Sequence, residues 1–184
     1  SVILLGPYGT IKDWANVTET GAWKGFALYA TILWGAALIV MPAVFYGTIR
    51  LAKRLAGAAE VAVKDVFLGY AYILVPLGLL AWIAFSFPLL LVNGTYILVV
   101  ASDPFGWGWD LFGTAHVPWT PLIPEYVVYI QMPLLAVGLL YALQRGYQAG
   151  VHLFGSDRAA LKALVPVGGF AMAVTLGFLV FFVG

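Results

Sequence analysis

Charged residues are almost confined to the gaps between long apolar stretches of this chain, and that segregation constrains its fold more than any other feature. The apolar stretches are Trp23–Ile49, Val66–Val92, Tyr126–Leu143 and Val165–Val183. A helix needs about 20 apolar residues to cross the bilayer core, and these stretches reach or approach that length. Only 9% of the residues are charged, where a soluble domain has about 25%. The sequence therefore predicts an all-α integral membrane bundle of four transmembrane helices.

The composition narrows both the domain organisation and the chemistry. A chain of 184 residues is expected to form a single transmembrane domain, with no room for a separate soluble catalytic module. The formal net charge of +1 and the lack of a long basic run argue against a nucleic-acid partner. There are no cysteines, which removes thiolate metal sites and cysteine-bound iron–sulfur clusters from the chemistry open to this chain.

Basic residues are distributed unevenly among the gaps. Seven of the nine lie in the stretches 50–65 and 145–162, and the other two are Lys12 and Lys24. The positive-inside rule then predicts that 50–65 and 145–162 are inner loops. The segment 1–22, the loop 103–124 and both termini are predicted to lie outside. We interpret the chain as a protein of a prokaryotic cytoplasmic membrane.

Turn and helix-breaking residues refine the spans. Pro42 predicts a kink in the first helix, and Pro76 and Pro88 interrupt the second apolar tract. Asn93-Gly94 is a strong turn signal, so the short segment 95–101 is expected to lie along the outer interface. The third helix is predicted to run past the membrane to Phe154, where Gly-Ser-Asp ends it and starts the next one.

The fourth helix carries small residues at intervals of four, namely Gly169, Ala173 and Gly177. Such a ridge lets a neighbouring backbone come close, which is how helices associate where hydrophobicity cannot drive them together. The ridge is expected to pack either within the bundle or on a partner helix.

The loop 103–124, called the cap below, alternates glycines with large aromatic residues. This composition predicts a compact irregular loop whose Trp rings settle at the membrane interface. Two interpretations stay open for Trp107, Trp109 and His116. They are interfacial anchors, or they form the wall of a quinone-headgroup site or the docking point of an external redox partner.

A second polar feature, called the Tyr141 stripe below, comprises Tyr141, Arg145, Gln148 and His152. Spacings of four, three and four place these residues on one face of the extended third helix. The stripe is suited to an anionic lipid headgroup, a quinone or a partner subunit. The alternative is a solvated helix end from which Arg145 snorkels to the interface.

Several chemistries find no support in the sequence. His116 and His152 are predicted on opposite faces of the membrane, so they cannot share one haem iron. The core spans contain no Asp, Glu, Lys, Arg or His, which argues against a proton or ion pathway. Gln131 and Ser86 are the most buried polar candidates, and we interpret both as packing contacts. The chain by itself is expected to be non-catalytic, with quinone as the one cofactor left open.

Two segments carry a resemblance to a known family. They are Tyr129-Ile-Gln-Met-Pro-Leu-Leu, continuing to Tyr141, and Gly150-Val-His-Leu-Phe-Gly-Ser-Asp, continuing to Pro166. With the tract from Tyr70 to Asp103, they resemble the closing helices of membrane-bound polyferredoxin proteins of the nitrogen-oxide-respiration type. The resemblance implies helices that pass electrons to or from quinols beside 4Fe-4S domains.

This chain departs from that family in having no cluster cysteines, so the clusters would belong to another subunit. Trp82 and Phe85 stand where such membrane regions ligate haem, so no haem is implied. The function expected is a non-catalytic membrane-anchor subunit of a respiratory or other electron-transfer complex, with redox subunits and lipids as partners. The alternative is a non-redox membrane scaffold, an assembly component or a transporter subunit.

Overall fold

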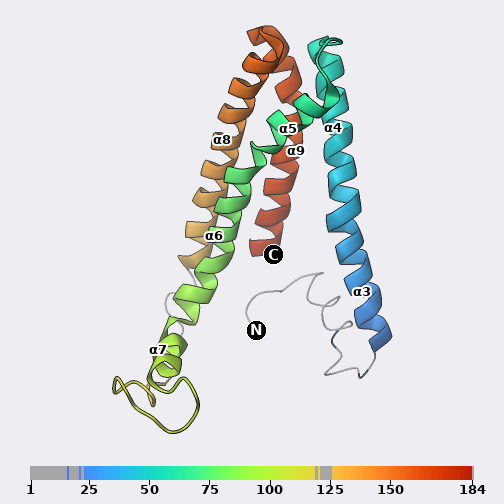
Figure 1. The fold of residues 1–184 in the computed structure, drawn as a ribbon. Helices are drawn as coiled ribbons and strands as arrows, with labels where there is room; N and C mark the ends of the chain where they lie inside the picture. Colours follow the sequence, from blue (N-terminus) through green and yellow to red (C-terminus); the bar gives the residue numbers. More distant parts are fainter. Residues whose placement is uncertain (1–15, 17–20, 22, 119, 121–125, 184) are drawn as a thin grey trace. The chain divides into compact units, whose positions relative to one another are not determined.

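The computed structural model describes residues 16, 21, 23–118, 120 and 126–183 (Figure 1). Most of the segment 1–22 and part of the cap therefore lie outside the described residues. The described part of the chain is helical and contains no strand. In chain order its helices are α3 (Trp23–Gly35), the π-helix η1 (Ala36–Val40), α4 (Met41–Ala56), α5 (Val63–Ala71), α6 (Leu74–Val92), α7 (Gly94–Ser102), α8 (Val127–Phe154) and α9 (Asp157–Val183).

The prediction of four transmembrane helices is confirmed. The stretches long and apolar enough to cross a membrane are Trp23–Ala56, Val63–Val92, Val127–Phe154 and Asp157–Phe182. Each exceeds the apolar tract that predicted it, because a helix continues into polar sequence until a residue breaks its hydrogen bonding. Much of 50–65 and 145–162 is consequently helical, and the chain reverses only over residues 57–62 and 155–156.

Glycines in the left-handed conformation end two of these helices. Gly57 has φ +69° and Gly155 has φ +63°, a region that side chains with a Cβ rarely adopt. The Gly155 N–H donates to the Val151 carbonyl at 2.8 Å, which closes α8 after Phe154. The predicted end of the third helix is thus confirmed.

The first span continues through Pro42 by widening its turn. A proline ring clashes with the carbonyl four residues earlier, here that of Leu38. The segment η1 lies just before this proline, and the Met41 N–H donates to the Ala36 carbonyl, five residues back. The π-helical turn displaces the carbonyls that the proline ring would meet, so α3, η1 and α4 form one helix (Figure 1).

The second apolar tract is divided near Pro76 and at Asn93 as predicted, whereas α6 continues through Pro88 without the predicted interruption. Pro76 cannot donate to the Tyr72 carbonyl, which instead accepts the Val75 N–H at 3.3 Å, and α5 and α6 are separated at this point. A turn at Asn93 separates α6 from α7, whose first N–H groups donate to the Asn93 carbonyl. The segment 95–101 is therefore helical.

The described chain divides into two compact units, Ser1–Val75 with Leu139–Gly184 and Pro76–Gly138. The first contains a core to which α4, α5 and α9 contribute. Three rings meet there, since the Phe45 centroid lies 5.2 Å from those of both Phe67 and Phe170. The buried members of this core are Phe45, Ile49, Ala52, Val66, Tyr70, Ile73, Ala163 and Val167.

Glycines on α8 allow close helix contacts in that unit. A Cβ added to Gly150 would lie 2.8 Å from the Tyr70 hydroxyl and 3.0 Å from the Ala160 Cβ. One added to Gly146 would lie 2.9 Å from the Leu164 Cδ1. These two glycines are four residues apart, so they form a small-residue ridge that contacts both α5 and α9.

The small-residue ridge predicted on α9 lies on the exposed face of that helix. Gly169, Ala173 and Gly177 are exposed, and a Cβ added to either glycine would meet no atom of the protein within 4 Å. The buried face of α9 instead carries a row four residues apart that includes Ala163, Val167, Ala171 and Thr175. Of the two interpretations of the ridge, packing within the bundle is not observed among the described residues.

In the second unit, Gln131 satisfies a carbonyl left free by a proline. Pro88 lies inside α6 and has no N–H to donate to the carbonyl four residues earlier, that of Ala84. The Gln131 Nε2 donates to this carbonyl at 3.0 Å, and Gln131 is only 3% exposed. The expected burial of Gln131 is confirmed, whereas Ser86 is only half-buried and donates to the Trp82 carbonyl of its own helix at 2.9 Å.

Candidate functional sites

Asp103 organises the first half of the cap. Its two carboxylate oxygens accept backbone N–H groups, Oδ1 from Trp107 at 2.9 Å and Oδ2 from Gly108 at 2.8 Å. Gly106 and Gly108 have φ of +66° and +81°, which lets the backbone turn both N–H groups toward one side chain. The cap therefore begins as a tight turn closed by an aspartate.

Ser102 and Asp110 anchor the second half of the cap. The fully buried Ser102 donates its hydroxyl hydrogen to Asp110 Oδ1 at 2.8 Å and accepts the Phe112 N–H at 3.1 Å. Asp110 Oδ1 also accepts the Ala115 N–H at 3.0 Å. The loop is thus tied to the last residue of α7. Sequence reasoning missed both aspartates, although an aspartate followed by glycines is a typical turn signal.

These contacts favour the charged form of Asp110. The Ala115 N–H and then the Ser102 hydroxyl hold the pKa of Asp110 below its usual value. The same hydrogen bonds that close the cap therefore stabilise the carboxylate form of Asp110.

Three aromatic rings cluster on the cap. Phe105 stacks on Trp107 with centroids 4.9 Å apart, and Trp109 meets Trp107 edge to face at 5.1 Å. Trp107 is 68% exposed and Trp109 is 42% exposed, so the cluster presents an open aromatic surface. His116 is exposed too, and among the described residues it makes no ring contact or hydrogen bond with either tryptophan. The structure brings the two tryptophans together without His116.

In the Tyr141 stripe, the structure joins three of the four residues. The Tyr141 hydroxyl oxygen accepts two hydrogen bonds from Arg145, from Nη2 at 2.7 Å and Nε at 3.1 Å, and the guanidinium carbon lies 5.1 Å from the Tyr141 ring centroid. The Arg145 Nη1 also approaches Gln148 Oε1 at 3.5 Å. His152 shares the face but none of these hydrogen bonds. Arg145 is therefore already occupied by neutral groups of its own helix.

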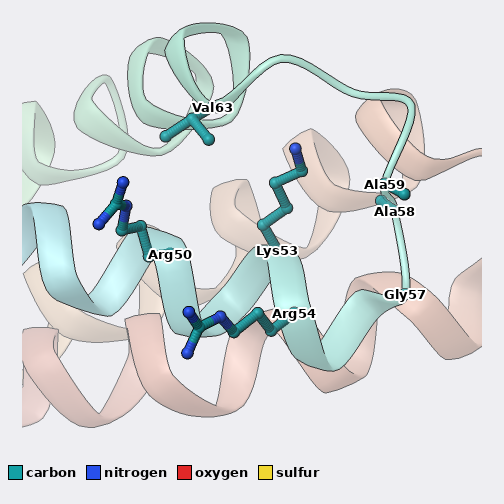
Figure 2. Close-up of a pocket in the computed structure, with 7 residues that line it drawn as sticks. All are labelled: Arg50, Lys53, Arg54, Gly57, Ala58, Ala59 and Val63. Atoms are coloured by element: carbon teal, nitrogen blue, oxygen red, sulfur yellow. The ribbon is translucent and has the colours of Figure 1, made fainter.

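A further polar site, called the α4–α5 pocket below, lies where the chain passes from α4 to α5 (Figure 2). Its volume is ≈ 430 Å³. In the sequence, the cations at this position indicate only the orientation of the chain in the membrane. The residues lining it are Arg50, Lys53, Arg54, Gly57, Ala58, Ala59 and Val63.

Together, the fold and the four spans define the chain as an all-α integral membrane protein. Comparison with protein-family models, with curated proteins and with solved structures found no match to this chain.

Proposed function

We propose that this chain is a membrane-anchor subunit, which carries no catalytic site of its own and assembles through its exposed helices with other membrane proteins. The observation that carries the proposal is the first span. Only 6% of its apolar window is buried inside the structure, and neither α3 nor η1 contains a buried residue. The α3–η1 part of this span therefore has its surface open to another subunit, whereas α4 packs in the core.

Two rows of small residues support association rather than exposure to lipid alone. Ala27, Thr31 and Gly35 follow one another at intervals of four on α3, and an added Cβ at Gly35 would meet nothing within 4 Å. The Thr31 hydroxyl donates to the Ala27 carbonyl at 2.8 Å, so it adds no unsatisfied donor to the row. The open ridge on α9 is the second row. Lipid tails gain little from such rows, whereas a neighbouring helix gains close contact.

The resemblance to membrane-bound polyferredoxin proteins makes an electron-transfer complex the assembly that we propose. In this complex the iron–sulfur clusters belong to a separate subunit, and the orientation is that of the positive-inside rule, with both termini outside. The aromatic cluster of the cap supports a quinone-headgroup site, since quinone rings favour aromatic walls with a few hydrogen-bonding groups. In this proposal His116 supplies one of the hydrogen-bonding groups of the site.

The experiment is affinity purification of the tagged chain from its native membrane, followed by mass spectrometry of co-purifying subunits. Gly35→Leu and Gly169→Leu are compared with Gly78→Leu. Gly78 is an exposed helical glycine with open space around it, but it lies between Leu74 and Trp82 rather than in a small-residue row. We expect each ridge variant to lower partner recovery several-fold, because a leucine side chain prevents the close approach of a neighbouring helix. The control should leave recovery unchanged, because leucine is a better helix former than glycine. Equal recovery from all three variants would contradict assembly through these rows.

The redox part of the proposal is tested on the same purified material. We expect iron–sulfur absorbance from a partner subunit, and lower quinol turnover with His116→Ala than with His152→Ala, which tests the Tyr141 stripe as the competing location. A colourless preparation without redox subunits would favour the non-redox scaffold. Unchanged turnover in the His116 variant would leave the chain as an anchor and remove the quinone site.

A further inference from the structure

We propose that the α4–α5 pocket binds the phosphate group of an anionic ligand. This inference does not depend on the identity of the complex, because it rests on the charge and shape of the pocket alone. It assigns a site to residues that otherwise appear only as the basic end of a membrane helix.

The charge of the pocket is concentrated and uncompensated. Arg50, Lys53 and Arg54 are spaced by three and four residues, so their side chains leave α4 on one face. Like charges at this spacing repel one another. Within the described part of the chain no carboxylate forms an ion pair with any of the three. The nearest acids in sequence, Glu60 and Asp65, do not line the pocket. An anion between the cations would replace this repulsion with attraction.

The backbone turn after α4 gives the pocket its shape. Gly57 takes the left-handed conformation, its N–H donates to the Arg54 carbonyl at 3.1 Å, and the Ala58 N–H donates to the Lys53 carbonyl at 3.4 Å. These paired bonds satisfy the last carbonyls of α4 and fold the chain back. The methyl side chains of Ala58 and Ala59 leave room in the turn. Figure 2 shows Arg50 and Lys53 rising from α4 toward the start of α5, where Val63 lies.

Phosphate matches this arrangement better than a smaller or singly charged anion. Guanidinium groups bind phosphate oxygens through paired N–H donors, and the Lys53 ammonium adds a compact point charge. The volume of ≈ 430 Å³ lies within the ~300–1,000 Å³ of small-molecule sites. Arg50 also lies over the Tyr46 ring, 5.1 Å from its centroid, which holds its guanidinium on the exposed side of α4. Arg145 differs from these cations, because Tyr141 and Gln148 already occupy its donors.

Two sources can supply such a phosphate. One is the headgroup of an anionic phospholipid, since basic pockets beside transmembrane helices on the cytoplasmic side bind such headgroups. The other is a soluble phosphate ester. The two share the group that the pocket recognises, and they differ in whether acyl chains are needed for binding.

The test measures binding to the purified full chain in neutral detergent at 150 mM salt, by native mass spectrometry and by the shift in unfolding temperature. The probes are dioleoyl phosphatidylglycerol, dioleoyl phosphatidylcholine and glycerol 3-phosphate. Lys53→Gln/Arg54→Gln is compared with Arg158→Gln/Lys162→Gln, which removes equal charge from exposed positions of α9 on the same predicted side of the membrane, outside the pocket. Ala58→Leu fills the pocket without changing its charge.

We expect the wild-type chain to bind phosphatidylglycerol in preference to phosphatidylcholine. The Lys53/Arg54 variant should weaken this binding by about tenfold or more, given the contribution of each cation near a membrane surface. The control pair should change it by less than about twofold, because neither of its residues lines the pocket. Ala58→Leu should weaken binding as well. If glycerol 3-phosphate binds and the pocket variants weaken its binding in the same way, the source is a soluble phosphate ester. If phosphatidylglycerol binds and glycerol 3-phosphate does not, the source is a lipid headgroup.

Several results would overturn the proposal. They are equal losses in the pocket and control pairs, unchanged affinity in Ala58→Leu, or no binding of either phosphate probe by the wild-type chain. The unfolding temperature of each variant without probe separates these results from misfolding. Lys53 and Arg54 are not buried, so their replacement leaves the core intact.

Discussion

Gln131 is a polar side chain of a membrane helix whose hydrogen bond goes to one particular carbonyl. In lipid no water is present to satisfy a backbone group that a proline has freed, so a neighbouring side chain has to do so. The Ala84 carbonyl, freed by Pro88, accepts the Gln131 amide from α8. This hydrogen bond links α6 and α8, and without it the Ala84 carbonyl and the Gln131 amide would both be left unsatisfied.

At the residue scale we predict that Gln131→Leu destabilises the protein by about 1 kcal/mol, the magnitude of an interhelical hydrogen bond in a membrane. Pro88→Ala should remove most of this cost, because the backbone N–H that alanine supplies at this position then donates to the Ala84 carbonyl. Unfolding titrations in mixed micelles would measure both changes. Gln144→Leu, at an exposed position of the same helix, is the control and should cost little. Additive effects of the Gln131 and Pro88 changes would contradict the shared carbonyl.

At the scale of elements, α8 and α9 carry glycines in similar patterns with opposite environments. Gly146 and Gly150 contact neighbouring helices, whereas Gly169 and Gly177 face open space. Both pairs have spacings that favour helix association, so spacing alone does not distinguish them. What distinguishes them is the rotation of each helix about its axis, which depends on contacts with residues distant in sequence such as Tyr70.

The contrast between α8 and α9 predicts different responses to one added methyl group. Gly150→Ala places a Cβ 2.8 Å from the Tyr70 hydroxyl and 3.1 Å from the Ala160 Cα, and such overpacking typically costs about 1–3 kcal/mol. Gly169→Ala meets no atom and should be neutral or slightly stabilising, since alanine favours the helix. Thermal unfolding of the two purified variants would measure the difference.

Tyr70→Phe offers a check on this mechanism. The Tyr70 hydroxyl is buried and has no hydrogen-bond partner among the described residues, so its removal takes away an unsatisfied polar group as well as the nearest clash. The double variant Gly150→Ala/Tyr70→Phe should therefore be more stable than Gly150→Ala alone. A double variant that is no more stable would show that Ala160, rather than Tyr70, sets the limit.

At the scale of the whole molecule, the distribution of basic residues predicts which side of the membrane each loop occupies. Seven of nine lie in 50–65 and 145–162, and the positive-inside rule places those stretches in the cytoplasm. The chain has no cysteine, so an introduced one is the sole target of a thiol reagent. We expect a membrane-impermeant maleimide on intact cells to label Leu111→Cys but not Ala59→Cys.

Both positions are exposed, and labelling after the membranes are opened is the control for reactivity. Equal labelling of the two in intact cells would contradict the topology. It would also place the α4–α5 pocket away from the cytoplasmic leaflet.

The apolar tracts predict the four spans, and the turn and helix-breaking residues predict the break near Pro76, the turn at Asn93 and the end of the third helix at Phe154. These features are local, because a membrane span must satisfy its backbone hydrogen bonds within itself, so its length is visible in consecutive residues. The alignment of Tyr141, Arg145 and Gln148 on one face was equally accessible, since helical spacing alone produces it.

Contacts between distant residues were decided by the tertiary structure. The close contact of Gly150 with Tyr70 joins α8 to α5 across 80 positions of the chain. The bond from Gln131 to Ala84 joins residues 47 positions apart. The cations of α4 become a pocket only because the turn at Gly57 brings Val63 back beside them. In each case the partner depends on how the helices rotate about their axes or how a turn closes, and the spacing of residues along one helix does not show this.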